Sequence, residues 1–407
     1  MPGAVRRIIG KRFTIALLVV AALAAGGWAS WRWWTGQFLR QGEEAFAARA
    51  FGKAKEHLAL YLSYRPDDTR GRLLAARTAR RLREYDEALE HLRRCRADGG
   101  DAEAITVEYA LINLQRGTEG PDEALRRRAL AQDELALVIL ETLIQYDIDT
   151  YQLRQAQQDL NLYLSRRPDD LHALLGRAYV WERFLNFADA LLDYQKAVAA
   201  HPRDDRARLR LADTLLIAGT PEEALEQYEH LAQRWPEKFE VRFGLARCRR
   251  RLGQLEEARQ ELDALPADGP EYGELFWERG LLALDQSRPQ DAEPALRRAA
   301  SLRPHDRRIC YSLSRCLLEL GQREEAQTWS ARADQLDADV RRLHQVCQEV
   351  QQRPNDATLR CEGGLLFLRN GEQLEGLRWL RLALRLDPNC SAARQALAAA
   401  AGARPAN

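Results

Sequence analysis

The sequence predicts an all-α protein, a solenoid of about ten helix-turn-helix repeats preceded by one N-terminal transmembrane helix. Three observations support this prediction. Small residues recur every 34 positions, proline or glycine recurs at fixed places between them, and an uncharged run of nineteen residues lies near the N-terminus. Internal repetition of this kind is typical of solenoids.

The uncharged run covers Phe13–Trp31 and would reach roughly 28 Å as a helix, close to the hydrocarbon thickness of a bilayer. Four cations precede the run, and tryptophans cluster at its end, where an interfacial belt is expected. The cations are Arg6, Arg7, Lys11 and Arg12, and the tryptophans are Trp28, Trp31, Trp33 and Trp34. The positive-inside bias predicts that residues 1–12 are cytoplasmic, residues 13–34 are an anchor, and the repeats are extracytoplasmic.

Two other interpretations of the N-terminus stay open. The short apolar core and the small residues at Ala22-Leu23-Ala24 also fit a cleaved signal peptide, which would export the repeats as the anchor does. A soluble N-terminal helix is the third interpretation. Length, flanking charge and the tryptophans favour the anchor.

The repeat is clearest in one phrase, because Leu60–Asp68 returns as Leu162–Asp170, three times 34 residues later. Windows of 34 residues give nine units over 35–340 and a tenth over 357–390. Position 20 of the windows holds Ala54, Ala88, Asp122, Ala156, Ala190, Ala224, Ala258, Ala292, Ala326 and Gly376, and position 8 is small in nine of ten. Antiparallel helices approach closely where both present small residues, so these positions predict the crossing.

Proline at position 32 ends the second helix of a window, since the residue before proline avoids the helical region. Seven windows have it: Pro66, Pro168, Pro202, Pro236, Pro270, Pro304 and Pro388. With small residues at 8 and 20 and proline at 32, Thr35–Cys390 resembles the tetratricopeptide repeat family. The resemblance implies a right-handed α-solenoid.

Three stretches depart from the repeat. The windows over 103–170 are degenerate, and we expect a long buried helix from Pro121 to about Gln145, with a break near Asp133 as an alternative. Residues 341–356 are an insert that should extend the preceding helix to about Gln352, before Pro354. Residues 391–407 should form a capping helix and a frayed tail.

Charge and motifs argue against nucleic-acid binding and against catalysis. Sixty-one Lys and Arg balance sixty Asp and Glu, so no overall basic field favours nucleic acid. Phosphate-binding loops, paired metal-ligand histidines and nucleophile elbows are absent from the sequence, which predicts no enzyme activity, metal or cofactor. The seven cysteines should be mostly free thiols, because spacing keeps Cys316 away from Cys248 and from Cys310.

The resemblance implies a concave groove lined by positions 2, 5, 9 and 12 of each first helix. Aromatic and arginine side chains there are suited to binding peptides. The candidate residues are Tyr179, Phe243, Arg247, Arg250, Trp277, Arg308, Tyr311 and Arg315. Alternatively, these aromatics pack between repeats and the arginines pair with Glu240, Glu274 and Glu278. The carboxylate-clamp subgroup has Lys and Asn at positions 5 and 9, which this chain lacks.

These patterns predict a membrane-anchored extracytoplasmic scaffold that binds proteins or extended peptides through the groove. A second hypothesis is a regulatory or carrier subunit of a membrane enzyme or transport complex, docking through the extended helix around Leu343. The two hypotheses differ in the surface that a partner would contact.

Overall fold

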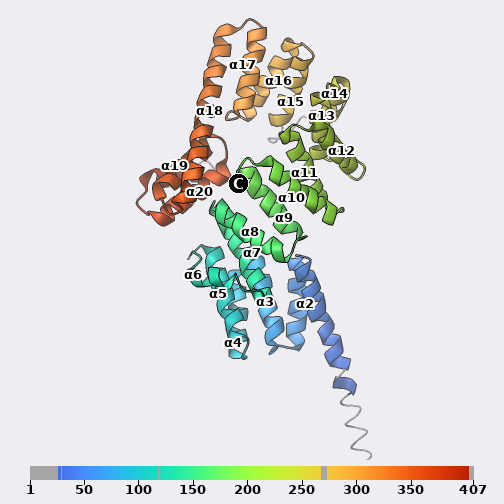
Figure 1. Ribbon diagram of the computed structural model, residues 1–407, viewed down its shortest axis with the longest axis vertical. Helices are drawn as coiled ribbons and strands as arrows, with labels where there is room; N and C mark the ends of the chain where they lie inside the picture. The colour runs from blue at the N-terminus through green and yellow to red at the C-terminus, as the bar shows by residue number, and fades with distance from the viewer. Residues whose placement is uncertain (1–25, 29, 118–119, 267–272, 403–407) are drawn as a thin grey trace, which may run out of the picture. The chain divides into compact units, whose positions relative to one another are not determined.

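The computed structural model describes residues 26–28, 30–117, 120–266 and 273–402, and all regular secondary structure within those ranges is helical (Figure 1). The chain divides into two compact units, Met1–Thr142 and Leu143–Asn407, which we describe separately. Unit 1 contains a helix over 30–47, then α2 (Phe51–Tyr64), α3 (Thr69–Arg81), α4 (Tyr85–Ala97), α5 (Ala102–Arg116), α6 (Glu123–Arg128) and the start of α7 (Glu134–Asp149).

Unit 2 continues as a series of helical hairpins. Its helices are α8 (Leu153–Arg166), α9 (Leu171–Arg183), α10 (Phe187–Ala200), α11 (Asp205–Ala218), α12 (Pro221–Ala232), α13 (Phe239–Arg251), α14 (Leu255–Asp263), α15 (Gly273–Asp285), α16 (Pro289–Leu302), α17 (Arg307–Glu319), α18 (Arg323–Gln352), α19 (Ala357–Arg369), α20 (Gln373–Leu386) and α21 (Ser391–Gly402). First helices of successive repeats contact each other, as α11, α13, α15 and α17 do in turn, so their outer positions form one continuous face.

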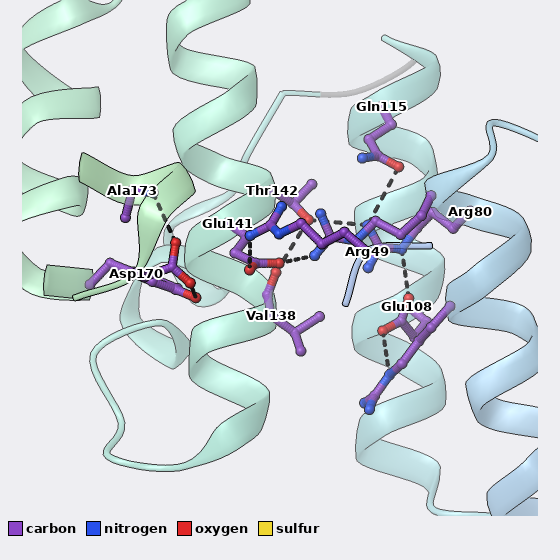
Figure 2. Close-up of polar contacts among 12 residues, drawn as sticks. Arg49, Arg80, Glu108, Gln115, Val138, Glu141, Thr142, Asp170 and Ala173 are labelled. Carbon is purple, nitrogen blue, oxygen red and sulfur yellow. Dashed lines mark hydrogen bonds and ion pairs between the residues drawn. The ribbon is translucent and has the colours of Figure 1, made fainter. Parts of the chain in front are cut away.

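The recurring Pro-Asp-Asp phrase ends one helix and begins the next. Its second aspartate is the N-cap of the following helix, and the carboxylate accepts a hydrogen bond from a backbone N–H of the first turn. Asp68 accepts from Gly71 N at 2.8 Å, and Asp170 accepts from Ala173 N at 2.9 Å (Figure 2). Asp204 caps α11 in the same way. The capping aspartates therefore fix these repeat boundaries locally.

The small residues at positions 8 and 20 lie in the helix crossings. Ala212 and Ala224 are fully buried in one cluster with Tyr194, Leu215 and Tyr228. Ala178 with Ala190 and Ala76 with Ala88 are buried in the same way. These positions confirm the predicted repeat phase.

We expect Ala224→Leu to destabilise unit 2 by about 1–3 kcal/mol, because the side chain has no exposed surface and the crossing holds no room for three more carbons. Thermal and urea unfolding of the purified chain would measure the effect. The control is Glu226→Leu, which adds a leucine at an exposed position of the same helix, outside the buried set of α12. Equal stability of Ala224→Leu and wild type would contradict the crossing.

The irregular stretches each have a local cause. The 121–145 region divides into α6 and α7, because Asp133 accepts a hydrogen bond from Ala136 N at 2.9 Å and pairs with Arg128 at 2.9 Å. This is the break near Asp133, and α7 runs on to Asp149 rather than ending at Gln145. Helix α18 extends for 30 residues and ends at Gln352, before Pro354.

In the part of the chain that the structure describes, none of the helices is both long enough and apolar enough to cross a membrane. The predicted anchor, residues 13–34, lies mostly in 1–25, outside the described residues. The frayed tail predicted beyond Gly402 also lies outside them.

Candidate functional site

The eight predicted groove residues do not form one continuous surface. Phe243 is only 7% exposed, and its ring stacks on Phe239 with centroids 5.5 Å apart. It belongs to the core between α13 and its neighbours rather than to a groove, which corrects the prediction for this residue. An aromatic residue at position 5 can face either way, because the neighbouring first helix decides how much of its ring is covered.

Arg247 and Arg250 are already paired within the chain. Arg250 donates to Glu278 and to Asp285, each at 2.8 Å, and Arg247 lies 3.6 Å from the other oxygen of Glu278. Glu278 is almost completely buried, so the two arginines neutralise a charge that would otherwise be costly in the interior. The alternative interpretation, in which arginines pair with Glu278, is correct here. These two arginines join α13 to α15 and are not free for a partner.

The Trp277 side chain is engaged in contacts with α17. Its indole N–H donates to Ser312 Oγ at 2.9 Å, and the guanidinium of Arg308 lies 4.6 Å from the ring centroid. Arg308 also pairs with Asp306 at 2.7 Å and with Glu274 at 3.3 Å. Trp277 therefore holds α15 against α17 and positions Arg308.

The face of α17 stays open. Positions 2, 5, 9 and 12 of this helix are Arg308, Tyr311, Arg315 and Leu318. Tyr311 is 41% exposed and Leu318 54%, and the side chain of Arg315 is 54% exposed with only a 3.8 Å contact to Glu319. The Tyr311 hydroxyl donates to Asp334 at 2.9 Å, and this hydrogen bond raises its pKa, so the tyrosine is neutral at physiological pH. Two exposed apolar groups alternate with two guanidinium groups along one helix.

A cavity of about 650 Å³ adjoins the N-terminal end of this face. It lies between the turn that precedes α17 and the turn that joins α19 to α20. Its lining residues are Leu302, Arg303, Pro304, His305, Asp306, Arg307, Arg308, Val340, Leu368, Asn370, Gly371, Glu372 and Gln373. Arg308 is common to the cavity and to the α17 face, so the two form one candidate site.

Tyr179 lies elsewhere in unit 2. Burial raises its pKa, and the charges that act on it are Arg183 on its own helix and Glu375 and Arg378 on α20. The structure thus brings together Arg308, Tyr311 and Arg315, with Trp277 behind them. It leaves Tyr179 beside a different set of groups.

Those groups belong to a contact between the two ends of unit 2 that sequence reasoning missed, and we call it the seam. Tyr151 packs edge-on against Phe367 and Trp379, with centroids 6.4 Å and 5.1 Å away. Gln351 donates to the Tyr151 carbonyl oxygen at 2.6 Å and accepts from Arg154 N at 3.2 Å. The partners are about 200 residues apart in sequence. The start of unit 2 is therefore in direct contact with its C-terminal helices.

The extended helix α18 also packs within unit 2 at the seam. Leu343 is 8% exposed, and Val346 and Val350 are fully buried. Burial raises the pKa of Cys347 to about 11, and its thiol lies against Tyr151. The apolar face of α18 is thus occupied within the chain, so the docking surface predicted around Leu343 is wrong.

Unit 1 contains a buried charge cluster that the sequence analysis did not find (Figure 2). Glu108 accepts from Arg80 at 2.7 Å and from Arg77 at 2.9 Å, and Arg80 also donates to Thr142 at 3.2 Å. Glu141 pairs with Arg49 at 2.9 Å and with Arg81. Arg80 and Glu108 have no exposed surface. The cluster therefore links the loop after the first helix to α3, α5 and α7.

One spacing recurs among these ion pairs and could have revealed them. Arg80 with Glu108, Glu182 with Arg210, and Arg250 with Glu278 are each 28 residues apart. In each pair, a residue at position 12 of one repeat contacts a residue at position 6 of the following repeat. The arginine is at position 12 in the first and third pairs, and the glutamate is at position 12 in the second pair. Adjacent first helices are joined by this pairing in both units.

Metal and thiol chemistry have little support in the described ranges. No group of three or more His, Cys, Asp or Glu residues there is arranged to hold a metal ion. The seven cysteines are Cys95, Cys248, Cys310, Cys316, Cys347, Cys361 and Cys390, and all are free thiols.

Comparison with known families agrees with the repeat geometry. Two tetratricopeptide repeat family models match, one over residues 215–278 and 283–350 and the other over 182–233. These models identify tetratricopeptide repeats over residues 182–278 and 283–350, a fold typical of protein interaction scaffolds. None of the curated proteins searched matches it.

Several solved structures are similar in part. A tetratricopeptide repeat protein from Parabacteroides merdae is 17% identical, with 70% of this chain and 98% of that chain covered and a TM-score of 0.36. Yeast Tom70 is 13% identical over 90% of this chain and 88% of its own, with a TM-score of 0.37. The Cut9–Hcn1 hetero-tetramer of the APC/C is 14% identical over 89% of each chain, with a TM-score of 0.39.

Proposed function

We propose that this protein is a membrane-anchored scaffold whose repeats are extracytoplasmic and bind an extended protein segment across the α17 face. The anchor and its orientation are supported by the uncharged residues 13–31 and the four cations before them. The proposed role is binding, since the α17 face offers exposed apolar and guanidinium groups of the kind that hold an extended segment.

One observation carries the binding proposal: all four outward positions of α17 are exposed. At three of the equivalent positions of α13, Phe243 lies in the core, and Arg247 and Arg250 form ion pairs with Glu278. Tyr311 and Leu318 offer apolar area, and Arg315 can pair with carboxylates or backbone carbonyls of a bound segment, whereas Arg308 is already paired with Asp306 and Glu274. The adjoining cavity can accept a side chain of that segment.

We expect the double change Tyr311→Ala with Arg315→Ala to abolish copurification of a partner from detergent-solubilised native membranes. The full-length chain would carry an affinity tag, and the bound proteins would be identified and quantified by mass spectrometry. Trp277→Ala is less suitable, because it would also disturb Ser312 and Arg308. For a purified partner, loss of both side chains should weaken binding by about 2 kcal/mol or more.

Arg259→Ala is the matched control. Arg259 is an exposed arginine on α14, where it pairs with Glu256 and Asp263 of the same helix. It should retain every partner of the wild type. Equal recovery of partners by the Tyr311 and Arg315 variant, at unchanged helicity, would place the binding surface elsewhere.

A further inference from the structure

Exposed aromatic side chains gather at one end of unit 1. We call this group the aromatic collar; it comprises Trp28, Trp31, Trp33, Trp34 and Tyr64, and the exposed Leu60 lies one turn before Tyr64 on α2. Each of these side chains is between 40% and 65% exposed. Soluble surfaces rarely leave so many large apolar groups uncovered side by side, so the collar requires an explanation.

The collar joins two helices of the first repeat. Trp34 packs edge-on against Tyr64 with centroids 5.1 Å apart, and Phe38 stacks on Tyr64 at 6.1 Å. The guanidinium of Arg65 lies 5.5 Å from the ring centroid of Trp31. The C-terminal end of α2 therefore reaches the same level as the tryptophans on the helix before it.

The height of the collar matches the headgroup layer of a bilayer. Trp31 and Trp34, the two tryptophans that contact the end of α2, are three residues apart, about 4.5 Å along the helix axis, and the headgroup region on one side of a bilayer is about 5–8 Å deep. Tryptophan and tyrosine concentrate at that depth. Arg32 and Arg65 lie over tryptophan rings, with their charged ends able to reach phosphates.

The tryptophans point in different directions, which favours lipid over a protein partner. At about 100° per residue, Trp31 and Trp34 lie within about 60° of each other on the helix over 30–47, and Trp33 lies about 100° or more from both. A docked protein helix covers one side, but lipid surrounds a helix completely. The residues from Phe13 to Ala25, which lead directly into the collar, contain no charge.

We propose that the collar is a lipid-interface surface, and that the end of α2 lies in the headgroups together with the tryptophans. This inference rests on the proposed anchoring. It adds that the first repeat is seated on the membrane rather than carried on a free tether. The contact would hold the first repeat in one orientation toward the membrane.

The test places a photo-crosslinking residue in α2. Full-length chain with Leu60→p-benzoylphenylalanine is reconstituted in phosphatidylcholine and phosphatidylglycerol vesicles and irradiated. Flotation reports anchoring, and mass spectrometry reports the lipid adducts. Leu130, 63% exposed in the same unit, receives the same residue as a control. Trp33 is a second probe position, in case the Leu60 variant folds poorly.

We expect the chain to float with the vesicles and to form several-fold more lipid adduct at position 60 than at position 130. Flotation with equal, low adduct at both positions would overturn the collar as a lipid surface and leave the anchor intact. An adduct between two copies of the protein at position 60 would indicate a protein interface and would also overturn it. A chain that does not float would overturn the anchor and the inference together.

Discussion

Replacing Trp379 with alanine is expected to destabilise unit 2 by about 3–5 kcal/mol, the largest effect that we expect from one core side chain. Trp379 is fully buried on α20. Its ring lies 5.1 Å from Tyr151, 5.3 Å from Phe367 and 5.0 Å from the Arg360 guanidinium. Removal of the ring would leave a large cavity and would take away the main apolar contact of the seam.

Hydrogen exchange of the full-length chain can locate this effect. Protection should fall in α19 and α20 and also around Tyr151, more than 200 residues earlier in the chain. Leu374→Ala on the same helix is the control, since that side chain is 86% exposed and should have little influence. A loss of protection confined to α19 and α20 would show that the seam does not hold the two ends together.

Gly363 allows a second check of the same contact. A Cβ atom at this position would lie 2.4 Å from the Trp379 ring, so Gly363→Ala alone should destabilise unit 2. With Trp379→Ala also present, the methyl group has space and the glycine change should cost much less. The two changes should therefore be strongly non-additive, as expected for residues in contact. Additive effects would contradict the packing described here.

The sequence could predict the helices because their signals are local. Ala224 marks a crossing, Asp68 and Asp170 cap helices that begin beside them, and Pro354 sets the end of α18. Each signal acts within a few residues or within one hairpin. The fold of the repeats follows from adding such signals at a fixed period.

The seam could not be predicted in this way, because it depends on the summed rotation of many repeats. Tyr151 lies in a degenerate window, at the positive-φ turn position where several other windows have glycine, so its turn conformation gives no sign of the distant contact. Its partners come from the repeat that follows the long α18. The sequence identified residues 341–356 as an insert, but it did not indicate that this insert contacts Tyr151.

The candidate site was predicted in part for a related reason. Repeat position identified which residues lie on the first helices, and Tyr311 and Arg315 are indeed exposed there. Position alone did not show that Glu278 would pair with Arg247 and Arg250. A search for opposite charges 28 residues apart would have separated paired arginines from open ones.

Replacing Glu108 with glutamine is expected to destabilise unit 1 by about 3–5 kcal/mol, because two arginines would lose the charge that neutralises them. Arg80 is fully buried and Arg77 is mostly covered, so neither can recover its hydration without opening the cluster. Hydrogen exchange in α3 and α5 would report the loss. Glu90→Gln is the control, since Glu90 pairs with Arg93 and Arg94 on the exposed side of α4.

The pH dependence of this effect separates charge from packing. Burial by itself would raise the pKa of Glu108, but Arg80 and Arg77 outweigh it and lower the pKa below its ordinary value of 4.5. A carboxyl with a lowered folded-state pKa stabilises the fold above its unfolded pKa and loses that contribution as the pH falls through the folded-state value. The stability difference between wild type and Glu108→Gln should therefore be constant near neutral pH and should shrink once the pH falls below 4.5. A difference that stayed constant throughout acidification would mean that Glu108 contributes by shape rather than by charge.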